Sequence, residues 1–378
     1  MKFIFSRIAD FYRESDKILS AICIFTTLFG CMAVFSATYY KESFRPLLVQ
    51  IIGMLLGLAA AFVISIFDFN KIIKSWLAIG LLGFVFVLLT FFIGIAPEGT
   101  DDKAWLDLGF TTVQPSEFFK LSFIVTFAAH LDKVKENINK PKYLLPVVVH
   151  GIFPVALIVV QGDFGSALVF AAIFFFMILQ AGLSFKYIAA GFSALAVSSP
   201  FIYFFIFNEE HRERLKTMFD FSADIQGAGY QQWRGRVALA NGGLTGQGYL
   251  KGDLTQAGVI PEGYNDFIFV TIGEELGFIG CMLVLVLLGA ICLRCLRIAK
   301  ICRKDAGKFI CVGVFAMIFA QTVINVGMCV SVLPVIGVTL PFFSSGGTSL
   351  LAIYLGIGLV LNVYMHRNSR TIYLHDNI

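Results

Sequence analysis

Ten long apolar stretches, separated by short polar segments, run through this chain and leave it few possible folds. They cover residues 18–38, 47–67, 76–95, 118–131, 144–160, 166–182, 188–207, 267–291, 309–333 and 346–364. A transmembrane helix needs about 20 mostly apolar residues, and most of these stretches approach that length. Because the stretches are continuously apolar rather than alternating, they argue against a transmembrane β-barrel. We therefore expect an all-α polytopic membrane protein with about ten transmembrane helices, built as one membrane domain over residues 1–378.

The composition agrees with this prediction. Hydrophobic residues make up 58% of the chain and charged residues 14%, whereas a soluble domain carries about 25% charged residues. The low polar content excludes an intrinsically disordered chain. The net charge of +4 does not require a nucleic acid partner, because basic loops on the cytoplasmic side of a membrane produce the same excess. None of the eight Cys lies in the long polar loop 208–266, so no disulfide framework is predicted.

The distribution of Lys and Arg predicts the orientation of the chain in the membrane. When the N-terminus is placed inside, most of the Lys and Arg residues in short loops fall on the inner side, as the positive-inside rule requires. Residues 1–17 then form a cytoplasmic tail, and 292–308 form a basic cytoplasmic loop. The segments 96–117 and 208–266 become extracytoplasmic loops. Both termini are therefore expected in the cytoplasm, with one large loop outside.

The two predicted outer loops contain most of the polar residues that lie near the spans. Residues 96–117 include the acids Glu98, Asp101 and Asp102. Residues 208–266 are too long for a structureless loop, and we expect structure of their own there. Within them Trp233, Val237 and Ala240 recur at helical spacing, which predicts a short amphipathic helix on the membrane surface. Since the chain has no soluble catalytic domain, any chemistry must take place in or beside the membrane.

Glu117 and Lys120 are ionisable residues at the start of a predicted span, where charged groups are costly. Pro115 in the first turn and a carboxylate near the positive end of a helix are ordinary features of a helix start. Lys120 is not, because the helix dipole disfavours a cation there. At i, i+3 the two residues can pair, and the sequence leaves a structural pair and a substrate site both open.

Asp163 and Asp266 are two further carboxylates at predicted outer span boundaries. Asp163 lies in the turn Gln161–Ser166, where it can cap the next helix or line a polar cavity. Asp266 directly precedes an apolar run, and the pattern alone favours a helix cap over the alternative, a general base with a raised pKa. Glu274 and Glu275 follow within the span and are expected to face a polar interior or partner residues.

Two other polar segments lie near the predicted outer surface. Arg212 and Arg214 form a basic patch that suits an anionic lipid or a pyrophosphate, although a solvated charged loop explains it equally well. The small residues from Ser344 to Ser349 favour close helix packing over a broken-helix binding site. The Gly-rich stretch 241–248 lacks the Lys-Ser/Thr of a phosphate-binding loop, so a nucleotide site is not expected.

Six motifs in a fixed order resemble the SEDS family (shape, elongation, division and sporulation) of polytopic membrane proteins. They are Trp105-Leu106-Asp107-Leu108-Gly109, Gln114-Pro115-Ser116-Glu117 with Lys120, Gly227-Ala228-Gly229-Tyr230, Pro261-Glu262 with Asp266-Phe267-Ile268-Phe269, Gly273-Glu274-Glu275-Leu276-Gly277, and Leu333-Pro334 through Gly346-Gly347. The resemblance runs over nearly the whole chain. Within the family, Thr255-Gln256 with Gly258 and Arg212-x-Arg214-Leu215 are most similar to the rod-shape branch, RodA; the division branch, FtsW, is the close alternative.

The resemblance implies an inverting peptidoglycan glycosyltransferase of the bacterial cytoplasmic (inner) membrane. Such an enzyme polymerises lipid II for cell-wall elongation and cell shape, releases undecaprenyl pyrophosphate, and works with a class B penicillin-binding protein as transpeptidase. The chemistry needs a carboxylate to accept a hydroxyl proton and cations to offset the charge on pyrophosphate. The resemblance implies Asp266 as the catalytic base. The substrate-binding candidates are Trp105, for stacking on sugar, with Glu117, Lys120, Asp163, Arg212, Arg214 and Glu262. A divalent cation (Mg or Mn) remains open without a ligand set, and no other cofactor is implied.

Three departures from the family pattern put detailed substrate contacts in question. The chain has Ala104-Trp105 where the family usually has Arg-Trp, Gln161-Gly162-Asp163 for Gln-Pro-Asp, and Ser344-Ser345-Gly346-Gly347 for Ser-Tyr-Gly-Gly. A lipid II flippase and a non-catalytic cell-wall scaffold remain as alternative functions. A flippase predicts polar residues spread along the spans, whereas here they concentrate at the outer ends, which favours an outward-facing enzyme.

Overall fold

The ten predicted spans correspond to ten long helices in a computed structural model, which describes residues 11, 13–96, 103–109, 112–207, 209–219 and 229–368. These helices are α2 (Lys17–Thr38), α3 (Arg45–Ile66), α5 (Trp76–Ile93), α6 (Pro115–Val134), α7 (Pro141–Gln161), α8 (Phe164–Gln180), α9 (Phe185–Phe201), α13 (Ile268–Ile301), α14 (Asp305–Cys329) and α15 (Gly347–Met365). Within the described residues, eight of them are long and apolar enough to cross a membrane. The other two are α8, an apolar helix of 17 residues, and α6, which has 20 residues but carries charged side chains. The all-α polytopic fold is therefore confirmed.

The shorter elements connect these helices. They are η1 (Tyr39–Lys41), α4 (Phe69–Lys74), η2 (Lys135–Asn137), the π-helical η3 (Ile202–Ile206), α10 (Glu209–Phe219), α11 (Tyr230–Gly242), α12 (Asp253–Gln256) and the antiparallel strands β1 (Leu106–Asp107) and β2 (Thr112–Val113). The large loop 208–266 thus has structure of its own. Its helix α11 carries Trp233 and Ala240 on an exposed face, while Ala238 is buried. The predicted helix is confirmed, and its contact with a membrane surface stays a prediction.

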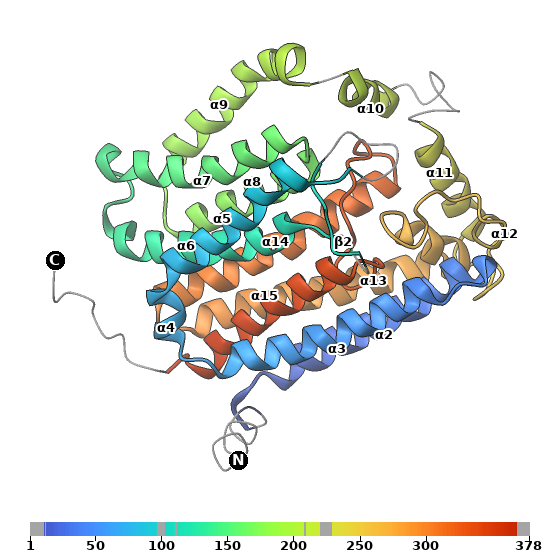
Figure 1. Cartoon of the computed structure of the whole chain (residues 1–378), viewed down its shortest axis with the longest axis horizontal. Helices are drawn as coiled ribbons and strands as arrows, with labels where there is room; N and C mark the ends of the chain where they lie inside the picture. The colour runs from blue at the N-terminus through green and yellow to red at the C-terminus, as the bar shows by residue number, and fades with distance from the viewer. Residues whose placement is uncertain are drawn as a thin grey trace.

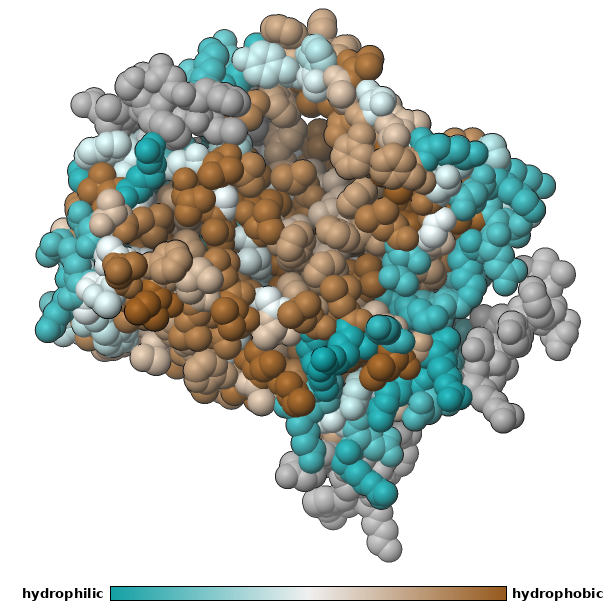
Figure 2. Space-filling model, turned by 180° about the vertical axis from the view of Figure 1, so that it is seen from behind, coloured by the Kyte–Doolittle hydropathy of each residue, from teal (hydrophilic) through white to brown (hydrophobic). Residues whose placement is uncertain are grey.

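The central helices differ from the outer ones in what they bury. α14 and α15 are largely enclosed by their neighbours, whereas none of the residues of α9 is buried; Figure 1 shows α9 along the upper edge of the bundle. Close approach of α3 and α15 depends on small residues, because a Cβ at Gly57 would lie 2.6 Å from the Tyr354 ring. On the outside, Figure 2 shows a broad hydrophobic surface with hydrophilic residues towards its sides, as expected for a bundle surrounded by lipid.

Several helices begin or end a few residues outside their predicted bounds, and α6 and α13 exceed the predicted length the most. α6 was expected over 118–131 but covers Pro115–Val134. α13 was expected to end at 291 but continues to Ile301, so the predicted basic loop 292–308 is mostly helical. One face of this extension is apolar and buried, through Cys295 and Ile298, and Leu, Arg and Lys are good helix formers. Arg294 on this extension pairs with the buried Asp16 at 2.7 Å.

The two ends of the bundle carry different polar groups. At the end predicted to be cytoplasmic, Lys304 donates to Asn70 at 2.9 Å and Lys308 pairs with Asp305 at 2.8 Å. At the opposite end α11 and α12 pack on the outer halves of α13 and α2, on the right of Figure 1. The carboxylates singled out in the sequence lie towards that second end.

Glu274 and Glu275 connect α13 to the polar loop. The Glu274 carboxylate, fully buried, accepts hydrogen bonds from the backbone N–H of Leu254 and from both the N–H and hydroxyl of Thr255, at 2.6–2.8 Å. Ser36 and Gln256 donate to Glu275. The expectation that these two acids face partner residues rather than lipid is confirmed. A break at Gly277, with φ +67°, lets the loop backbone pair with α13 just beyond them, where Phe278 N–H donates to the Gly243 carbonyl at 2.9 Å.

Candidate active site

The starts of α6 and α8 bring the first two polar segments together. Lys120 donates to Glu117 at 2.7 Å, and both side chains are buried, with exposures of 1% and 4%. Asp163 caps α8 by accepting from the Ser166 N–H at 2.8 Å. Its other carboxylate oxygen accepts from the Gln114 amide, also at 2.8 Å, which connects α8 to the residue before α6. The predicted ion pair and the predicted helix cap are both confirmed.

Asp266 belongs to the turn that precedes α13. The residue at the cap position of this helix is Phe267, and no side-chain capping bond is made there. The cap interpretation of Asp266, which the sequence pattern favoured, is therefore wrong. The helix begins one residue later than predicted, because the Phe267 N–H still belongs to the turn and donates to the Glu262 carbonyl at 3.0 Å. The Asp266 carboxylate does not cap α13. It lies close to Gly337, where a Cβ would be 3.7 Å from its Oδ2.

The surroundings of Asp266 favour its protonated form. Removal of the carboxyl from water is the largest cause, and with the negative charges of Glu262 and Asp163 it raises the pKa to about 7 against the lowering effect of the Arg214 guanidinium. Burial also raises the pKa of Asp163, against the lowering effects of its Ser166 hydrogen bonds and of Lys120. A carboxyl that titrates near neutral pH is suited to act as a general base.

The loop between α14 and α15, residues 330–346, packs against the start of α8, which follows Asp163, and against the turn that contains Asp266. Arg214 donates to the Val335 carbonyl at 3.2 Å and Gln232 to the Leu333 carbonyl at 2.8 Å. Ser344 donates to the Asn265 carbonyl at 2.8 Å. A Cβ at Gly165, in the first turn of α8, would lie 2.4 Å from the Ile336 carbonyl oxygen. The loop therefore connects the α8 turn, the Asp266 turn and α10.

The two arginines of the basic patch have different surroundings. Arg212 donates to the carbonyls of Tyr203 and Phe204, at 3.0 and 2.7 Å, and so holds α10 against the end of η3. Arg214 reaches the α14–α15 loop and lies in the electrostatic environment of Asp266. Of the two arginines, Arg214 is the one whose charge acts on the Asp266 carboxyl.

Glu262 and Trp105 lie at the margin of this arrangement. Glu262 is exposed, adopts a left-handed backbone with φ +51°, and accepts a hydrogen bond from the Asn265 amide at 2.7 Å. Trp105 pairs through its backbone with Ile95, and its side chain is half-buried. Several residues named in the sequence analysis lie outside the described part of the chain. They are the tail residues 1–10 and 12, Glu98, Asp101, Asp102, Gly227 and Ala228.

Some residues that build the site were not selected from the sequence. Gln114 bonds Asp163, and Gly337 and Asn325 contact the Asp266 turn. Asn325 carried a usable signal, because a polar residue inside a predicted span is a functional candidate. Among the residues that the structure describes, no group of three or more His, Cys, Asp or Glu side chains is arranged to hold a metal ion. Ligands for the divalent cation left open by the sequence are thus not identified.

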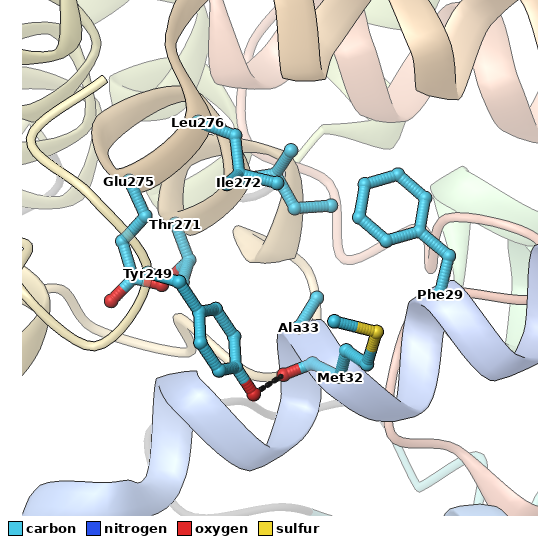
Figure 3. A pocket seen from close by; sticks show the side chains of 8 residues that line it. All are labelled: Phe29, Met32, Ala33, Tyr249, Thr271, Ile272, Glu275 and Leu276. Atoms are coloured by element: carbon cyan, nitrogen blue, oxygen red, sulfur yellow. Dashed lines mark hydrogen bonds between the residues drawn. The ribbon is translucent and has the colours of Figure 1, made fainter. Parts of the chain in front are cut away.

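A separate cavity of about 180 Å³ lies between α2 and α13. Its lining is almost entirely apolar, and Figure 3 shows the Tyr249 hydroxyl at its edge, bonded to the Met32 carbonyl at 3.1 Å. Glu275 reaches the same cavity with a carboxylate that Ser36 and Gln256 already satisfy. None of the predicted site residues lines this cavity.

Comparison with known proteins identifies the family. The model of the cell cycle protein family FtsW/RodA/SpoVE matches residues 16–369. The chain is 32% identical to the peptidoglycan glycosyltransferase MrdB of Escherichia coli K12, over 70% of this chain and 71% of that protein. It is 30% identical to the probable peptidoglycan glycosyltransferase FtsW of Geobacter metallireducens, over 92% and 94%.

Solved structures agree with the fold. One chain from a study of how a peptidoglycan synthase complex coordinates polymerisation and crosslinking superimposes with a TM-score of 0.82 at 26% identity, covering 94% of this chain and 99% of that chain. The crystal structure of the rod-shape-determining protein RodA of Thermus thermophilus gives a TM-score of 0.70 at 24% identity, covering 94% and 98%. The chain belongs to the FtsW/RodA/SpoVE family of cell cycle proteins, the SEDS family that its motifs indicate.

Proposed function

We propose that this chain is a peptidoglycan glycosyltransferase that polymerises lipid II, with Asp266 as its catalytic base. The observation that carries the proposal is the Asp266 carboxyl, which makes no capping bond and has its pKa raised to about 7 by burial and by the charges of two other acids, against the effect of an arginine. Relatives named peptidoglycan glycosyltransferases support the same reaction.

The reaction needs one proton acceptor. The 4-hydroxyl of the acceptor N-acetylglucosamine attacks the anomeric carbon of the donor sugar, the bond from that carbon to undecaprenyl pyrophosphate breaks, and the configuration inverts. Asp266 takes the hydroxyl proton, so the carboxylate becomes neutral while the pyrophosphate departs with the electron pair. A base whose pKa lies near the working pH is the most effective, because it is both present in ionised form and basic enough.

The leaving group gains negative charge and needs cations. Lys120, Arg214 and Arg212 are the candidates, and Arg214 is the one whose charge acts on Asp266 in the structure. Lys120 is already paired with Glu117, so it is suited to hold the site together and to present its remaining N–H groups to phosphate. Asp163, Glu262 and Trp105 complete the candidates for contacts to the substrate, Trp105 by stacking on sugar.

The partner and the cellular role form the finer part of the proposal. A structural relative comes from a complex that combines polymerisation with crosslinking, which supports a class B penicillin-binding protein as the transpeptidase partner here. Both a rod-shape-determining protein, RodA, and proteins named FtsW match the chain. We favour elongation and cell shape, because the stretch Thr255–Gly258 and the Arg212–Leu215 segment are more similar to the rod-shape branch.

Purified protein with its cognate penicillin-binding protein, supplied with lipid II in detergent, tests the reaction. Glycan chains whose length grows with time, with release of undecaprenyl pyrophosphate, are expected. The same protein in sealed vesicles distinguishes the flippase alternative. Transbilayer movement of labelled lipid II without chain formation would contradict the proposal, as would the absence of both.

A further inference from the structure

The side chain of Asn325, on α14, donates to the backbone of two segments of the site, the Asp266 turn and the α14–α15 loop. Its amide nitrogen donates to the Asp266 carbonyl at 2.8 Å and to the Val338 carbonyl at 2.7 Å. The side chain is completely buried. The two acceptors belong to segments that lie more than seventy residues apart in sequence, and one amide group connects them.

We propose that Asn325 is a positioning residue that fixes the Asp266 turn on the α14–α15 loop and thereby aims the Asp266 carboxylate into the site. This proposal rests on the proposed function of Asp266 as base. Asn325 itself does not touch the reacting atoms. It acts through the backbone of the residue that does.

The orientation of the Asn325 amide follows from its partners. Both partners are carbonyl oxygens, which only accept, so the nitrogen and not the oxygen must face them. Each of the two amide hydrogens has one acceptor. No other common side chain of this size offers two donors from one uncharged atom. Within a bundle where an unmatched polar group is costly, this arrangement fixes both backbone segments at once.

Ser344 and Ser345 join the α14–α15 loop to the neighbouring carbonyls of Asn265 and Tyr264. Within the described residues, the Asp266 carbonyl itself has one other contact. The Cys329 thiol, one helical turn after Asn325, reaches the same oxygen at 3.6 Å, and thiols are weak donors. Gly337, next to Val338, lies close to the carboxylate, so the segment that Asn325 fixes is the one that faces Asp266 Oδ2. Loss of the two Asn325 hydrogen bonds would move the Asp266 carboxylate relative to Gly337 and let water reach it.

The chain contains a matched control at the opposite end of the bundle. Asn362 on α15 is 1% exposed and donates its amide nitrogen to the carbonyls of Ile64, Ser65 and Phe67, at 2.7–3.1 Å. It fixes the end of α3 with the same chemistry, far from the carboxylates. Replacing either Asn by Leu removes the same kind of hydrogen bonds and introduces a side chain of nearly the same volume.

The experiment compares wild type, Asn325→Leu and Asn362→Leu in lipid II polymerisation over pH 5–9. We expect Asn325→Leu to lower the plateau rate about 10²-fold, the order of loss caused by a small misplacement. We also expect it to shift the acidic limb of the profile to lower pH by about one unit, because a better solvated Asp266 has a lower pKa. Asn362→Leu should lose as much thermal stability as Asn325→Leu, but the midpoint of its pH–rate profile should equal that of wild type.

A readout that needs no activity separates this proposal from the proposed function. The difference in Tm between each protein and its Asp266→Asn derivative, measured against pH, reports the titration of Asp266 itself. The pH midpoint of this Tm difference should be lower for Asn325→Leu than for wild type and unchanged for Asn362→Leu, whether or not the preparation polymerises lipid II. Inactive wild type would contradict the proposed base, whereas equal midpoints in all three backgrounds would contradict the role of Asn325.

Asn325→Ala covers the case in which Asn325→Leu does not fold. The smaller side chain leaves space for a water molecule to donate to both carbonyls, so the variant should fold and show a smaller shift in the same direction. Wild-type rate and midpoint in Asn325→Ala would overturn the proposal.

Discussion

Lys120 and Glu117 form a buried ion pair one turn apart on α6, with 2.7 Å between ammonium and carboxylate. Only one oxygen of Glu117 is satisfied in this way. Its Oε2 is buried and has no hydrogen-bond partner among the residues that the structure describes. Buried ion pairs contribute little net stability, since the desolvation cost offsets the attraction. A pair of this kind beside Asp163 is thus better explained by a role in the site than by a role in stability.

Removing one member of this pair should be worse for stability than removing both. Lys120→Met leaves the Glu117 carboxylate buried without its partner, which typically costs about 3–5 kcal/mol. The double variant Lys120→Met/Glu117→Gln leaves no charge behind and should unfold at a higher temperature than the single variant. Thermal unfolding in detergent measures this difference. If both contribute to substrate binding, the double variant should fold well yet lose polymerisation, and wild-type activity in it would contradict that role.

The rate of polymerisation should rise with pH around a midpoint near 7. A base works only when deprotonated, and burial with the charges of Glu262 and Asp163 raises the pKa of Asp266 to about 7. Because Arg214 lowers this pKa, Arg214→Ala should move the midpoint to higher pH. Arg212→Ala is the matched control, since Arg212 contacts the carbonyls of η3 instead. The same midpoint in both variants would show that Arg214 does not act on the carboxyl.

Asp266→Asn should stabilise the protein at alkaline pH. An Asp in an unfolded chain has a pKa near 3.9, and the folded value of about 7 is higher. The folded state therefore holds a proton that the unfolded state releases between these values, and this contribution to stability is lost as pH rises through 7. Asn cannot ionise, so Tm at pH 8 should exceed that of wild type, and the difference should vanish below about pH 4.

Asp253→Asn, in the exposed first turn of α12, is the control for this stability effect. It should leave the pH dependence of Tm unchanged. A wild-type Tm profile that does not differ from that of Asp266→Asn across pH 5–8 would refute the raised pKa.

Glu274→Gln should weaken the attachment of α12 to α13, while polymerisation activity remains. Glu274 accepts three hydrogen bonds from Leu254 and Thr255, and a glutamine offers one acceptor oxygen in place of two. Each charge-assisted bond of this kind contributes about 1.5–3 kcal/mol. Faster hydrogen exchange over α12 is expected, with a Tm decrease of several degrees. Unchanged exchange at Leu254 and Thr255 would contradict the role of Glu274 as the anchor of this loop.

Much of the fold was predictable from the sequence, because apolar length alone locates a transmembrane helix. All ten spans were found, and errors were confined to their ends. The predicted α6 was too short, since the charged Glu117 at one end and Asp132 and Lys133 at the other bound the apolar pattern that defines a span. α13 was too short because Arg294 was counted as loop, whereas in the structure it pairs with Asp16. The hydropathy of a sequence does not show whether a charged residue is paired inside a helix bundle or exposed in a loop.

The site was only partly predictable. The i, i+3 pair of Glu117 and Lys120 and the cap formed by Asp163 follow from local rules, and both are confirmed. The cap assigned to Asp266 failed, because the turn that starts at Glu262 closes through backbone bonds and local sequence does not report which group closes it. Contacts between distant segments, such as Asn325 with Asp266, depend on tertiary packing and have no local signature.

The most direct test of the account is the rate of lipid II polymerisation by wild type and Asp266→Asn, each folded and each bound to the same penicillin-binding protein. The two side chains have nearly the same size, so the comparison isolates the proton acceptor. A general base contributes about 10²–10⁴-fold to a rate, and we predict a loss of that order with lipid II binding retained. Glycan chains formed at equal rates by both proteins would contradict the assignment of Asp266 as the catalytic base.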